Sequence, residues 1–325
     1  MTGPVERICP ICGGGLLPLG PRYSIDQLLE LWRPVTFSAA IRDEHAAQSA
    51  FTQLHRCPDC RLGIFLPRII GTARFYSEAY NLEGTQSESA FTYSAEKWDF
   101  FEGLRDVRPG DSVLEIGAGV GHFLIIARER GCSVVGVEFN EIAAVTARAR
   151  GLTVHRSLEP LLRSGEKFDR IFAFHVLEHV ADPIGFLTDL QRLARPEGRI
   201  GIAVPNQDGP IRLIEPCVQD MPPHHATRWS YTTFERAAEK VKLEIDRAAR
   251  EPLTPGNLYY YSEYAPRRLL TDRTCLGAAA IRLGSMVIGR VLRGYLGLLR
   301  GFGRTSSKLL PGQAIYVQLA LRPAR

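Results

Sequence analysis

The stretch Val113-Leu-Glu-Ile-Gly-Ala-Gly-Val-Gly-His-Phe-Leu124 decides the fold of this chain. An apolar run leads into Gly117, Gly119 and Gly121, and a second apolar segment follows them. Glycines at this spacing let the backbone turn sharply and approach a ligand closely. The first turn of a helix offers free N–H groups at a partially positive end. The stretch therefore predicts a buried strand, a glycine loop and a helix, although a tight turn that binds no ligand would show the same glycines.

Further strand and helix patterns alternate after the glycine loop. We expect strands at residues 112–116, 133–138, 153–156, 168–174 and 199–204, and helices at 121–130, 140–150 and 183–195. Strands separated by helices of roughly ten to fifteen residues indicate βαβ units and a parallel sheet. A helix at 232–242, a strand at 243–249 and an alternating segment at 314–321 would complete the sheet. The predicted fold is therefore α/β, doubly wound and Rossmann-like.

A carboxylate ends the strand that follows the glycine loop. Glu138 lies 17 residues after Gly121, and Glu115 lies just before the loop. In a doubly wound fold, an acid at the position of Glu138 accepts hydrogen bonds from the ribose hydroxyls of a nucleoside. The two acids favour a nucleoside-containing ligand over an empty turn.

The length and composition are those of an ordinary globular protein. The chain has 325 residues, of which 45% are hydrophobic and 23% charged, which suggests about two domains and excludes disordered and fibrous classes. The mean hydropathy is -0.08, and no run of about 18 uncharged apolar residues predicts a membrane-spanning helix. Residues 1–15 lack the basic and apolar regions of a signal peptide, so we expect a cytoplasmic protein.

Four histidines fall where a doubly wound fold binds its ligands. His175 and His179 follow the strand predicted at 168–174, and His224 and His225 lie in a later loop that two prolines stiffen. A histidine titrates near neutral pH, so one on a stiff loop over a pocket suits general-base catalysis. His224, His225 and His179 are therefore candidate catalytic residues. The alternatives are that the loop histidines only shape a lid and that His179 makes a structural hydrogen bond.

Four cysteines form two Cys-x-x-Cys pairs, Cys9, Cys12, Cys57 and Cys60. Without secretory context such pairs indicate a metal site rather than disulfides, and four thiolates suit tetrahedral Zn²⁺. Because four thiolates leave no open coordination position, we expect a structural zinc ion. The long gap between the pairs predicts an insertion with a helix near 25–32. Two unrelated pairs of reduced thiols are the alternative, and His45 or His55 could replace one ligand.

Three motifs together resemble those of class I S-adenosylmethionine-dependent methyltransferases. They are Glu115–Gly121, Gly136–Glu138 and Phe174–Pro183. The resemblance covers roughly residues 95–250 and continues weakly to 322. It implies a seven-stranded sheet with a reversed last hairpin, formed here by 243–249 and 314–321, and it implies S-adenosylmethionine as the cofactor.

The resemblance also implies which residues bind the cofactor. They are Glu115, Gly117, Ala118, Gly119, Gly121, Glu138, Phe139, Ser157, Leu158 and His175. Gly117 and Gly119 would line the methionine moiety. Glu115 would lie under its amino group, and Glu138 would hold the ribose. Ser157 replaces the acid that is usual in the segment flanking adenine.

Two features bear on the acceptor. Many relatives carry a Pro-Pro-His-His segment facing the acceptor, as at Pro222–His225 here, and a four-cysteine ribbon precedes the methyltransferase domain in many bacterial sugar and natural-product methyltransferases. A small-molecule acceptor is therefore expected, with a sugar or glycan precursor as the first choice. The alternatives are an RNA methyltransferase with an RNA-binding zinc ribbon and a non-catalytic scaffold that binds S-adenosylmethionine. Residues 1–265 carry a net charge of −5, which argues against nucleic acid, and the intact glycine loop argues against the scaffold.

The chain divides into four parts. We expect a zinc-ribbon module with an insertion at 1–70, a helical lead-in at 71–108, the methyltransferase core at 109–265, and a basic segment with the last strand at 266–325. The last part holds eleven Lys or Arg residues and one acid. On a helix over 278–304, five arginines share one face opposite apolar residues, which suits peripheral contact with an anionic membrane. Packing of the apolar face on the core or on a second subunit is the alternative, and the oligomeric state is left open.

Overall fold

The described residues form two β-sheets, and the larger one is the mostly parallel sheet that the sequence predicts. The computed structural model describes residues 7–33, 35–80, 97–252, 254, 257, 261–264, 286–291, 294–295 and 312–322. The order of the seven strands is β10 (Leu243–Arg250), β11 (Ala314–Leu321), β8 (Ala194–Pro205), β7 (Phe168–Phe174), β4 (Ser112–Ile116), β5 (Ser133–Val137) and β6 (Thr153–His155). The five strands from β8 to β6 pair in parallel, and β11 is antiparallel to both β8 and β10. The prediction of a mostly parallel seven-stranded sheet with a reversed hairpin is confirmed.

Helices connect these strands. They are α5 (His122–Glu129), α6 (Glu141–Ala149), α7 (Glu159–Ser164), α8 (Pro183–Leu193) and α9 (Tyr231–Lys240). The Asn140 side chain caps α6, as expected, and a capping box of Ser230 and Thr233 starts α9. α7 was not predicted. β8 begins five residues earlier than expected, because the chain passes directly from α8 into pairing with β7, where Ala194 lies opposite Phe168.

Side-chain alternation along β7 divides the core into two layers. Phe172 and Phe174 pack with the aromatic side chains of α4 (Trp98–Leu104) and α5. Ile171 and Ala173 belong to the cluster that includes the apolar side chains of α8 and α9. Successive residues of a strand point to opposite faces, so one apolar strand supplies both layers.

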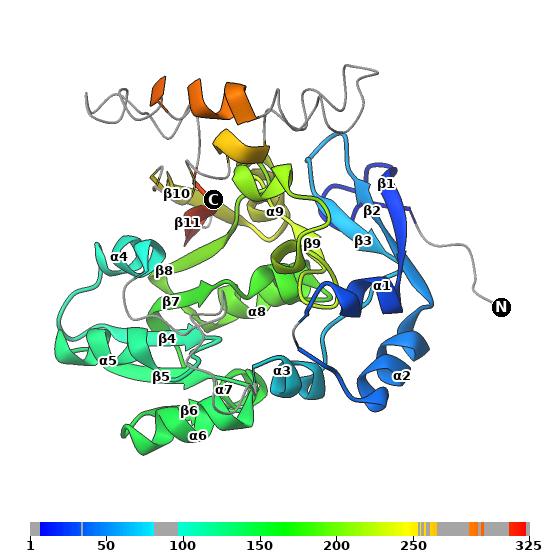
Figure 1. The fold of residues 1–325 in the computed structure, drawn as a ribbon. Coiled ribbons are helices and arrows are strands. Elements are labelled where there is room, and N and C mark those ends of the chain that lie inside the picture. The colour runs from blue at the N-terminus through cyan, green and yellow to red at the C-terminus, as the bar shows by residue number, and fades with distance from the viewer. Residues whose placement is uncertain are drawn as a thin grey trace.

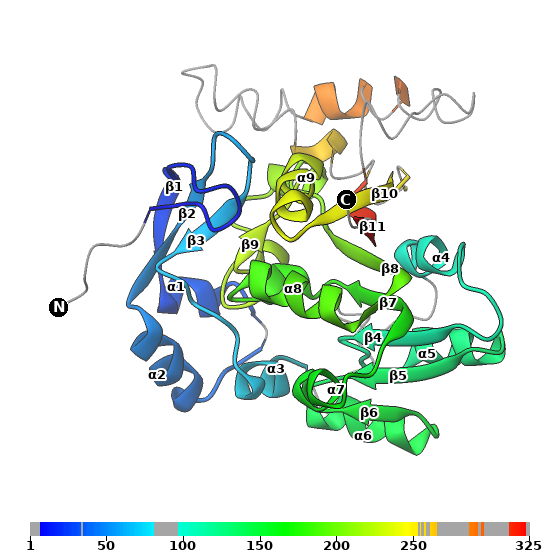
Figure 2. The ribbon, with the colours of Figure 1, turned by 180° about the vertical axis from the view of Figure 1, so that it is seen from behind.

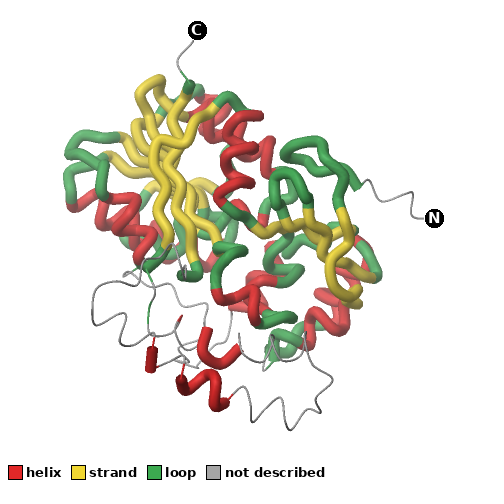
Figure 3. The backbone as a smooth tube through the Cα atoms, turned by 90° about the horizontal axis from the view of Figure 1, so that it is seen from above, coloured by secondary structure: helices red, strands yellow, loops and turns green. Residues whose placement is uncertain are grey.

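The smaller sheet joins segments that are far apart in the sequence. Its order is β1 (Leu17–Ser24), β2 (Phe51–Arg56), β3 (Gly63–Leu66) and β9 (Thr227–Arg228), all antiparallel. The helix predicted near 25–32 is α1 (Ile25–Glu30), and α2 (Ala39–Gln48) was not predicted. Figure 3 shows the two sheets as separate groups of strands. Because β9 follows β8 in the chain, residues beyond the predicted module boundary at 70 complete the sheet of the module.

The lead-in predicted at 71–108 contains α3 (Ala73–Tyr80) and α4. Figures 1 and 2 both show α3 on the side of the large sheet that faces the amino-terminal module. Each of the two helices contributes side chains to the site described below.

The basic segment predicted at 278–304 lies mostly outside the described residues. Residues 286–291 and 294–295 are described and are helical, and Val287, Ile288 and Val291 are exposed there. Within the described part of the chain, no helix has both the length and the apolar character needed to span a bilayer.

Candidate active site

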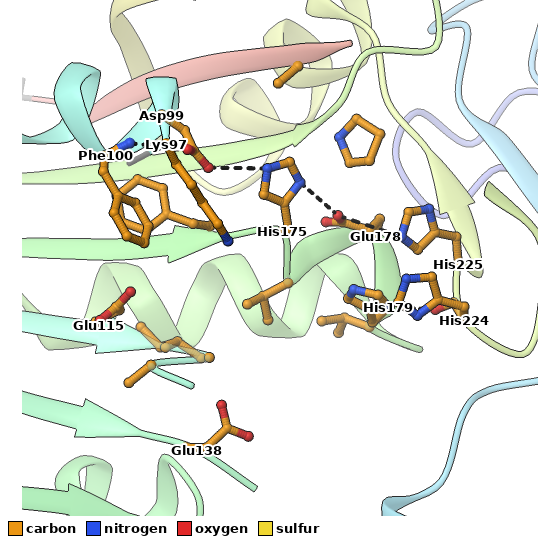
Figure 4. A pocket seen from close by; sticks show the side chains of 18 of the residues that line it. Lys97, Asp99, Phe100, Glu115, Glu138, His175, Glu178, His179, His224 and His225 are labelled. Carbon is orange, nitrogen blue, oxygen red and sulfur yellow. Dashed lines mark hydrogen bonds and ion pairs between the residues drawn. The ribbon is translucent and has the colours of Figure 1, made fainter. Parts of the chain in front are cut away.

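A cavity of about 780 Å³ lies at the carboxyl ends of the parallel strands, the edge where doubly wound folds bind ligands. Its wall comes from the glycine loop and the end of β5, the segment after β7, the loop between β8 and β9, and helices α3 and α4. Figure 4 shows Glu115 and Glu138 at one end, here named the carboxylate end, and His179, His224 and His225 at the other, here named the histidine end. The cavity thus brings most of the predicted site residues together.

The glycine loop requires its glycines for two reasons. Gly117, Gly119 and Gly121 have φ angles of 74°, 53° and 86°, a left-handed backbone that other residues rarely adopt. A Cβ atom at Gly117 would lie 2.5 Å from Val176 Cγ2, and one at Gly121 would lie 2.1 Å from Leu152 Cδ1. The predicted sharp turn is present, and Gly117 and Ala118 line the cavity.

Glu138 is fixed in place while facing the carboxylate end. Its Oε2 accepts a hydrogen bond from the Gly119 N–H at 2.8 Å, and its Oε1 accepts one from the Asn140 N–H at 2.8 Å. Burial raises the pKa of Glu138, and these N–H groups oppose that shift. Each carboxylate oxygen can accept more than one hydrogen bond. A rigid, buried carboxylate with acceptor capacity remaining is what two ribose hydroxyls require.

Glu115 has an unsatisfied oxygen at the same end. The side chain is 3% exposed, and its Oε2 has no hydrogen-bond partner among the described residues. Burial raises the pKa of Glu115 well above its ordinary value. An unpaired buried carboxylate oxygen is costly, so an ammonium group or a bridging water in the cavity would stabilise it. The unpaired carboxylate oxygen of Glu115 therefore fits the amino group of a methionine moiety.

The other predicted cofactor residues are placed differently. Phe139 lines the cavity and is 46% exposed. Gly119 and Gly121 shape the loop but are not among the lining residues, and neither are Ser157 and Leu158, which follow β6. Ser157 is exposed and Leu158 is half-buried. A role for Ser157 and Leu158 at adenine stays a prediction.

His175 links α4 to the short 3₁₀ helix η1 (Leu177–His179). Its Nε2 lies 3.1 Å from Asp99 Oδ2, and its Nδ1 lies 3.4 Å from Glu178 Oε1. Desolvation alone would lower the pKa of His175, but the two carboxylates raise it to about 10. His175 has a φ of 56°, a conformation that costs a non-glycine residue about 1–3 kcal/mol. The residue predicted to contact the cofactor is therefore an imidazolium held between two acids.

The histidine end contains three closely packed imidazoles. The ring centroids of His224 and His225 are 4.4 Å apart, and the His179 ring lies 4.6 Å from the first and 4.8 Å from the second. His179 Nδ1 lies 2.5 Å from the carbonyl oxygen of His224 and 3.0 Å from Tyr76 Oη. Burial lowers the pKa of His179 to about 4 and lowers that of His224 well below 6.5. Both rings are therefore neutral at physiological pH.

The same three histidines are poorly arranged for a metal site. Their ring nitrogens lie within 4.8 Å of one another, but the rings of His224 and His225 are stacked at an interplanar angle of 20°. The lone pairs of imidazole nitrogens lie in the ring plane, so two nearly parallel rings do not direct theirs to one point. The arrangement suits proton transfer better than metal coordination.

His179 and His224 predict a loss of stability at acidic pH. A histidine in an unfolded chain titrates near a pKa of about 6.5, above the lowered pKa of either group. Below about pH 6.5 the unfolded state therefore binds protons that the folded state does not, and the free energy of unfolding falls as the pH falls. We expect urea unfolding at about pH 7.5 and about pH 5 to show a smaller decline for His179→Gln than for the wild type. His155→Gln on β6 is the matched control, and equal declines in all three proteins would contradict the prediction.

His175 has the opposite linkage to pH. Its pKa in the folded chain, about 10, lies above the unfolded value. The stability that it contributes is fully present below about pH 6.5 and is lost as the pH rises through about 10.

Several lining residues were missed by the sequence analysis. They are Tyr76, Lys97, Asp99 and Glu178. Glu178 lies inside the motif Phe174–Pro183, between two histidines that were singled out, so the motif could have indicated it. Tyr76 and Asp99 come from α3 and α4, and only the tertiary structure brings these helices to the cavity.

The four cysteines meet at the end of the module that adjoins α9. Their sulfur atoms all lie within 4.8 Å of one another, with Cys9 and Cys60, and Cys12 and Cys57, each 3.4 Å apart. Four Zn–S bonds of about 2.3 Å at tetrahedral angles require sulfur separations of about 3.8 Å. The cluster therefore has the dimensions of a closed four-thiolate site.

The two Cys-x-x-Cys turns share one hydrogen-bonding pattern. The Gly13 N–H donates to the Cys9 carbonyl, and the Arg61 N–H donates to the Cys57 carbonyl. Gly13 and Arg61 both have positive φ angles, 79° and 65°. Two equivalent turns that face each other present two thiols each to one point, which supports a shared metal ion over two unrelated pairs.

Comparison with known proteins agrees with the topology and the motifs. Residues 89–248 match the model of a family described as a methyltransferase domain. The chain is 35% identical over 105 residues to a ubiquinone biosynthesis O-methyltransferase of Dinoroseobacter shibae, covering 30% of this chain and 40% of the relative. It is 38% identical over 113 residues to the protein of the same name in Rhizobium etli strain CFN 42, covering 33% of this chain and 43% of that relative.

The similarity is confined to part of each relative, since this chain spans less than half the length of either one. Among solved structures, an S-adenosylmethionine-dependent methyltransferase of Mesorhizobium loti is 16% identical, with a TM-score of 0.44, covering 70% of this chain and 98% of that one.

Proposed function

We propose that this chain, whose residues 89–248 match a methyltransferase domain, is a class I S-adenosylmethionine-dependent methyltransferase that methylates a small molecule with His225 as the general base. One observation carries the proposal. A single cavity holds a buried carboxylate, Glu138, at one end and the histidine cluster at the other. The methyl donor and the acceptor can therefore meet in one cavity.

The residues at the carboxylate end would hold the cofactor. Glu138 would accept hydrogen bonds from the ribose, Glu115 would face the amino group, and the backbone at Gly117 would lie against the methionine moiety. When bound, the cofactor supplies a methyl group on a sulfonium with a good leaving group. The task of the protein is then to align the acceptor and exclude water. Helices α3 and α4 would help to exclude water, since both line the cavity.

His225 is better placed than its neighbours to take a proton from the acceptor. It lines the cavity, its Nδ1 lies 3.5 Å from Asp220 Oδ1, and its Nε2 lies 3.9 Å from Glu178 Oε1. Carboxylates on both sides stabilise the imidazolium that forms when His225 accepts the proton. His179 is held instead by the His224 carbonyl, so it supports the loop.

The proposed acceptor is a sugar or glycan precursor that presents a hydroxyl group. The resemblance of the amino-terminal module to that of bacterial sugar methyltransferases supports this class. The names of the matched relatives, both O-methyltransferases, support oxygen as the acceptor atom. Transfer of labelled methyl groups to a panel of sugars, nucleotide sugars, quinol precursors and RNA tests the choice, and labelling of RNA alone would overturn it.

The four-cysteine cluster is proposed to hold one structural Zn²⁺. Cys9, Cys12, Cys57 and Cys60 would each supply a thiolate. The ion would stabilise the two turns and, through them, β3. It would take no part in the reaction, since four thiolates fill its coordination sphere.

Two substitutions are expected to weaken cofactor binding. Glu138→Ala removes the charged acceptor, at a cost of about 1–3 kcal/mol. Gly119→Arg puts a side chain on a residue with a φ of 53° in a loop that lines the cavity. Calorimetric titration with S-adenosylmethionine measures both effects, with Glu129→Ala at the exposed end of α5 as the control. Wild-type affinity in both folded variants would refute the assignment.

A further inference from the structure

The loop that carries the histidines is held between the two sheets. On the module side, the Gly71 N–H donates to the Pro223 carbonyl at 2.7 Å, and the Phe65 N–H donates to the Ala226 carbonyl at 3.1 Å. On the side of the large sheet, the Ala226 N–H donates to the Glu178 carbonyl at 2.9 Å. The position of His225 therefore depends on the module as well as on the methyltransferase domain.

Arg228 connects this loop to the smaller sheet. Arg228 lies in β9, where it pairs with Gly63 of β3. A Cβ atom added at Gly63 would lie 3.0 Å from the Cβ of Arg228, so the two strands are in close contact here. The guanidinium of Arg228 lies over the Phe65 ring, 5.1 Å from the centroid. The residue is only 9% exposed, so its charge requires partners.

The main partner of Arg228 is Asp220, at the end of the 3₁₀ helix η3 (Val218–Asp220). Arg228 Nε lies 2.7 Å from Asp220 Oδ2, and its Nη2 donates to the Asp220 carbonyl at 3.1 Å. Glu215 lies 3.4 Å from Nη1. The planar guanidinium thus contacts Asp220 twice, through an ion pair with its carboxylate and a hydrogen bond to its carbonyl, an arrangement that a lysine ammonium does not reproduce.

The second oxygen of Asp220 faces His225. Asp220 is 4% exposed, and its Oδ1 lies 3.5 Å from His225 Nδ1, the outer limit of a hydrogen bond. Because a carboxylate can only accept, a hydrogen bond at this contact requires the proton on Nδ1 and leaves the lone pair on Nε2. The charged and titratable groups facing His225 are then Asp220 from η3, Glu178 and His179 from η1, and His224 on its own loop.

We propose that Asp220 is a positioning residue that sets the tautomer and orientation of His225, and that Arg228 ties Asp220 to the cysteine module. The role in turnover rests on the proposed function, in which His225 is the base. The module is then part of the acceptor site: its sheet carries Arg228, Arg228 holds Asp220, and Asp220 orients His225.

The tautomer of His225 can be measured without any acceptor. In protein labelled with ¹⁵N-histidine, long-range proton–nitrogen correlation distinguishes Nδ1–H from Nε2–H. We expect Nδ1–H in the wild type at about pH 7.5 and loss of that preference in Asp220→Asn, whose amide can also donate. Asp43→Asn on the exposed face of α2 is the matched control. Nε2–H in the wild type, or an unchanged tautomer in Asp220→Asn, would overturn the proposal.

Turnover gives the second readout. Asp220→Asn is expected to lower kcat by up to about 10⁴-fold, the loss that follows when the orienting aspartate of a Ser-His-Asp triad is replaced by asparagine, with S-adenosylmethionine affinity unchanged. Arg228→Lys is expected to give a smaller loss than Arg228→Met, because it keeps the charge. Wild-type kcat in Asp220→Asn would overturn the proposal while leaving methyl transfer established. A shifted tautomer in a protein that methylates no acceptor would support Asp220 as a positioning residue while refuting the proposed function.

Discussion

Removal of the proposed zinc ion from the four-cysteine site is expected to slow methyl transfer strongly while cofactor binding persists. Binding of zinc to such sites is worth about 10–16 kcal/mol, and that energy is largely folding energy of the surrounding turns. The Cys60 carbonyl accepts a hydrogen bond from Thr233 Oγ1 at 2.9 Å, and β3 pairs with β9, so disorder in the turns reaches the histidine loop. A displacement of about 1 Å can reduce a rate about 10²-fold.

Elemental analysis, turnover and calorimetry together check this prediction. We expect about one zinc ion per chain, because four thiolates coordinate one Zn²⁺. Cys60→Ser should lose the ion, and its kcat should fall by at least about 10²-fold. The affinity for S-adenosylmethionine should change much less, because the glycine loop and Glu138 lie at the other end of the cavity. Cys132→Ser, near the start of β5 and outside the cluster, is the matched control. Full turnover by metal-free protein, or no metal in protein prepared without chelators, would contradict the prediction.

Replacement of His225 by alanine is expected to lower kcat by about 10²–10⁴-fold, the usual contribution of a general base. S-adenosylmethionine binding should be nearly unaffected, since His225 lies at the histidine end. His224→Ala should have a smaller effect, because the lowered pKa of His224 makes it a weak base. His179→Ala should also be milder, since burial lowers the pKa of His179 to about 4 and makes it a weak base as well.

The matched control for these variants is His155→Ala on β6, outside the lining of the cavity. If His225→Ala and His224→Ala both keep full turnover on the true acceptor, the loop only covers the cavity. If His224→Ala alone is severely impaired, the base has been assigned to the wrong neighbour.

Local patterns predicted the strands of the large sheet, and the resemblance to methyltransferases implied its reversed last hairpin. Most of its strands contain a short, mainly apolar run beside turn residues, and three glycines in five residues can adopt left-handed backbone at all three positions. The capping of α6 by Asn140 was predictable for the same reason, since the side chain bonds only to its own first turn. Boundaries were less predictable where tertiary pairing extends a strand, as at Ala194, which is held by β7 rather than by any local signal.

The electrostatics of the site could not be predicted from the sequence. The histidine end was indicated by its residues, but the charge of His175 depends on Asp99, 76 positions earlier in the chain, and on the placement of α4. β9 has only two residues, too few to show any periodicity, so its place in the smaller sheet was not expected. The contact between Asp220 and Arg228 depends on that placement.

The two ends of the cavity are built from different parts of the chain, and this has a consequence for how acceptor specificity can change between related proteins. The carboxylate end is built from the glycine loop and the end of β5, within residues 89–248 that match the family. The histidine end also depends on α3 and on the module, which lie outside that range. Exchange of the amino-terminal part would therefore alter acceptor specificity while the donor stays the same. Chains that share the catalytic domain can thus inherit one methyl donor and serve different acceptors.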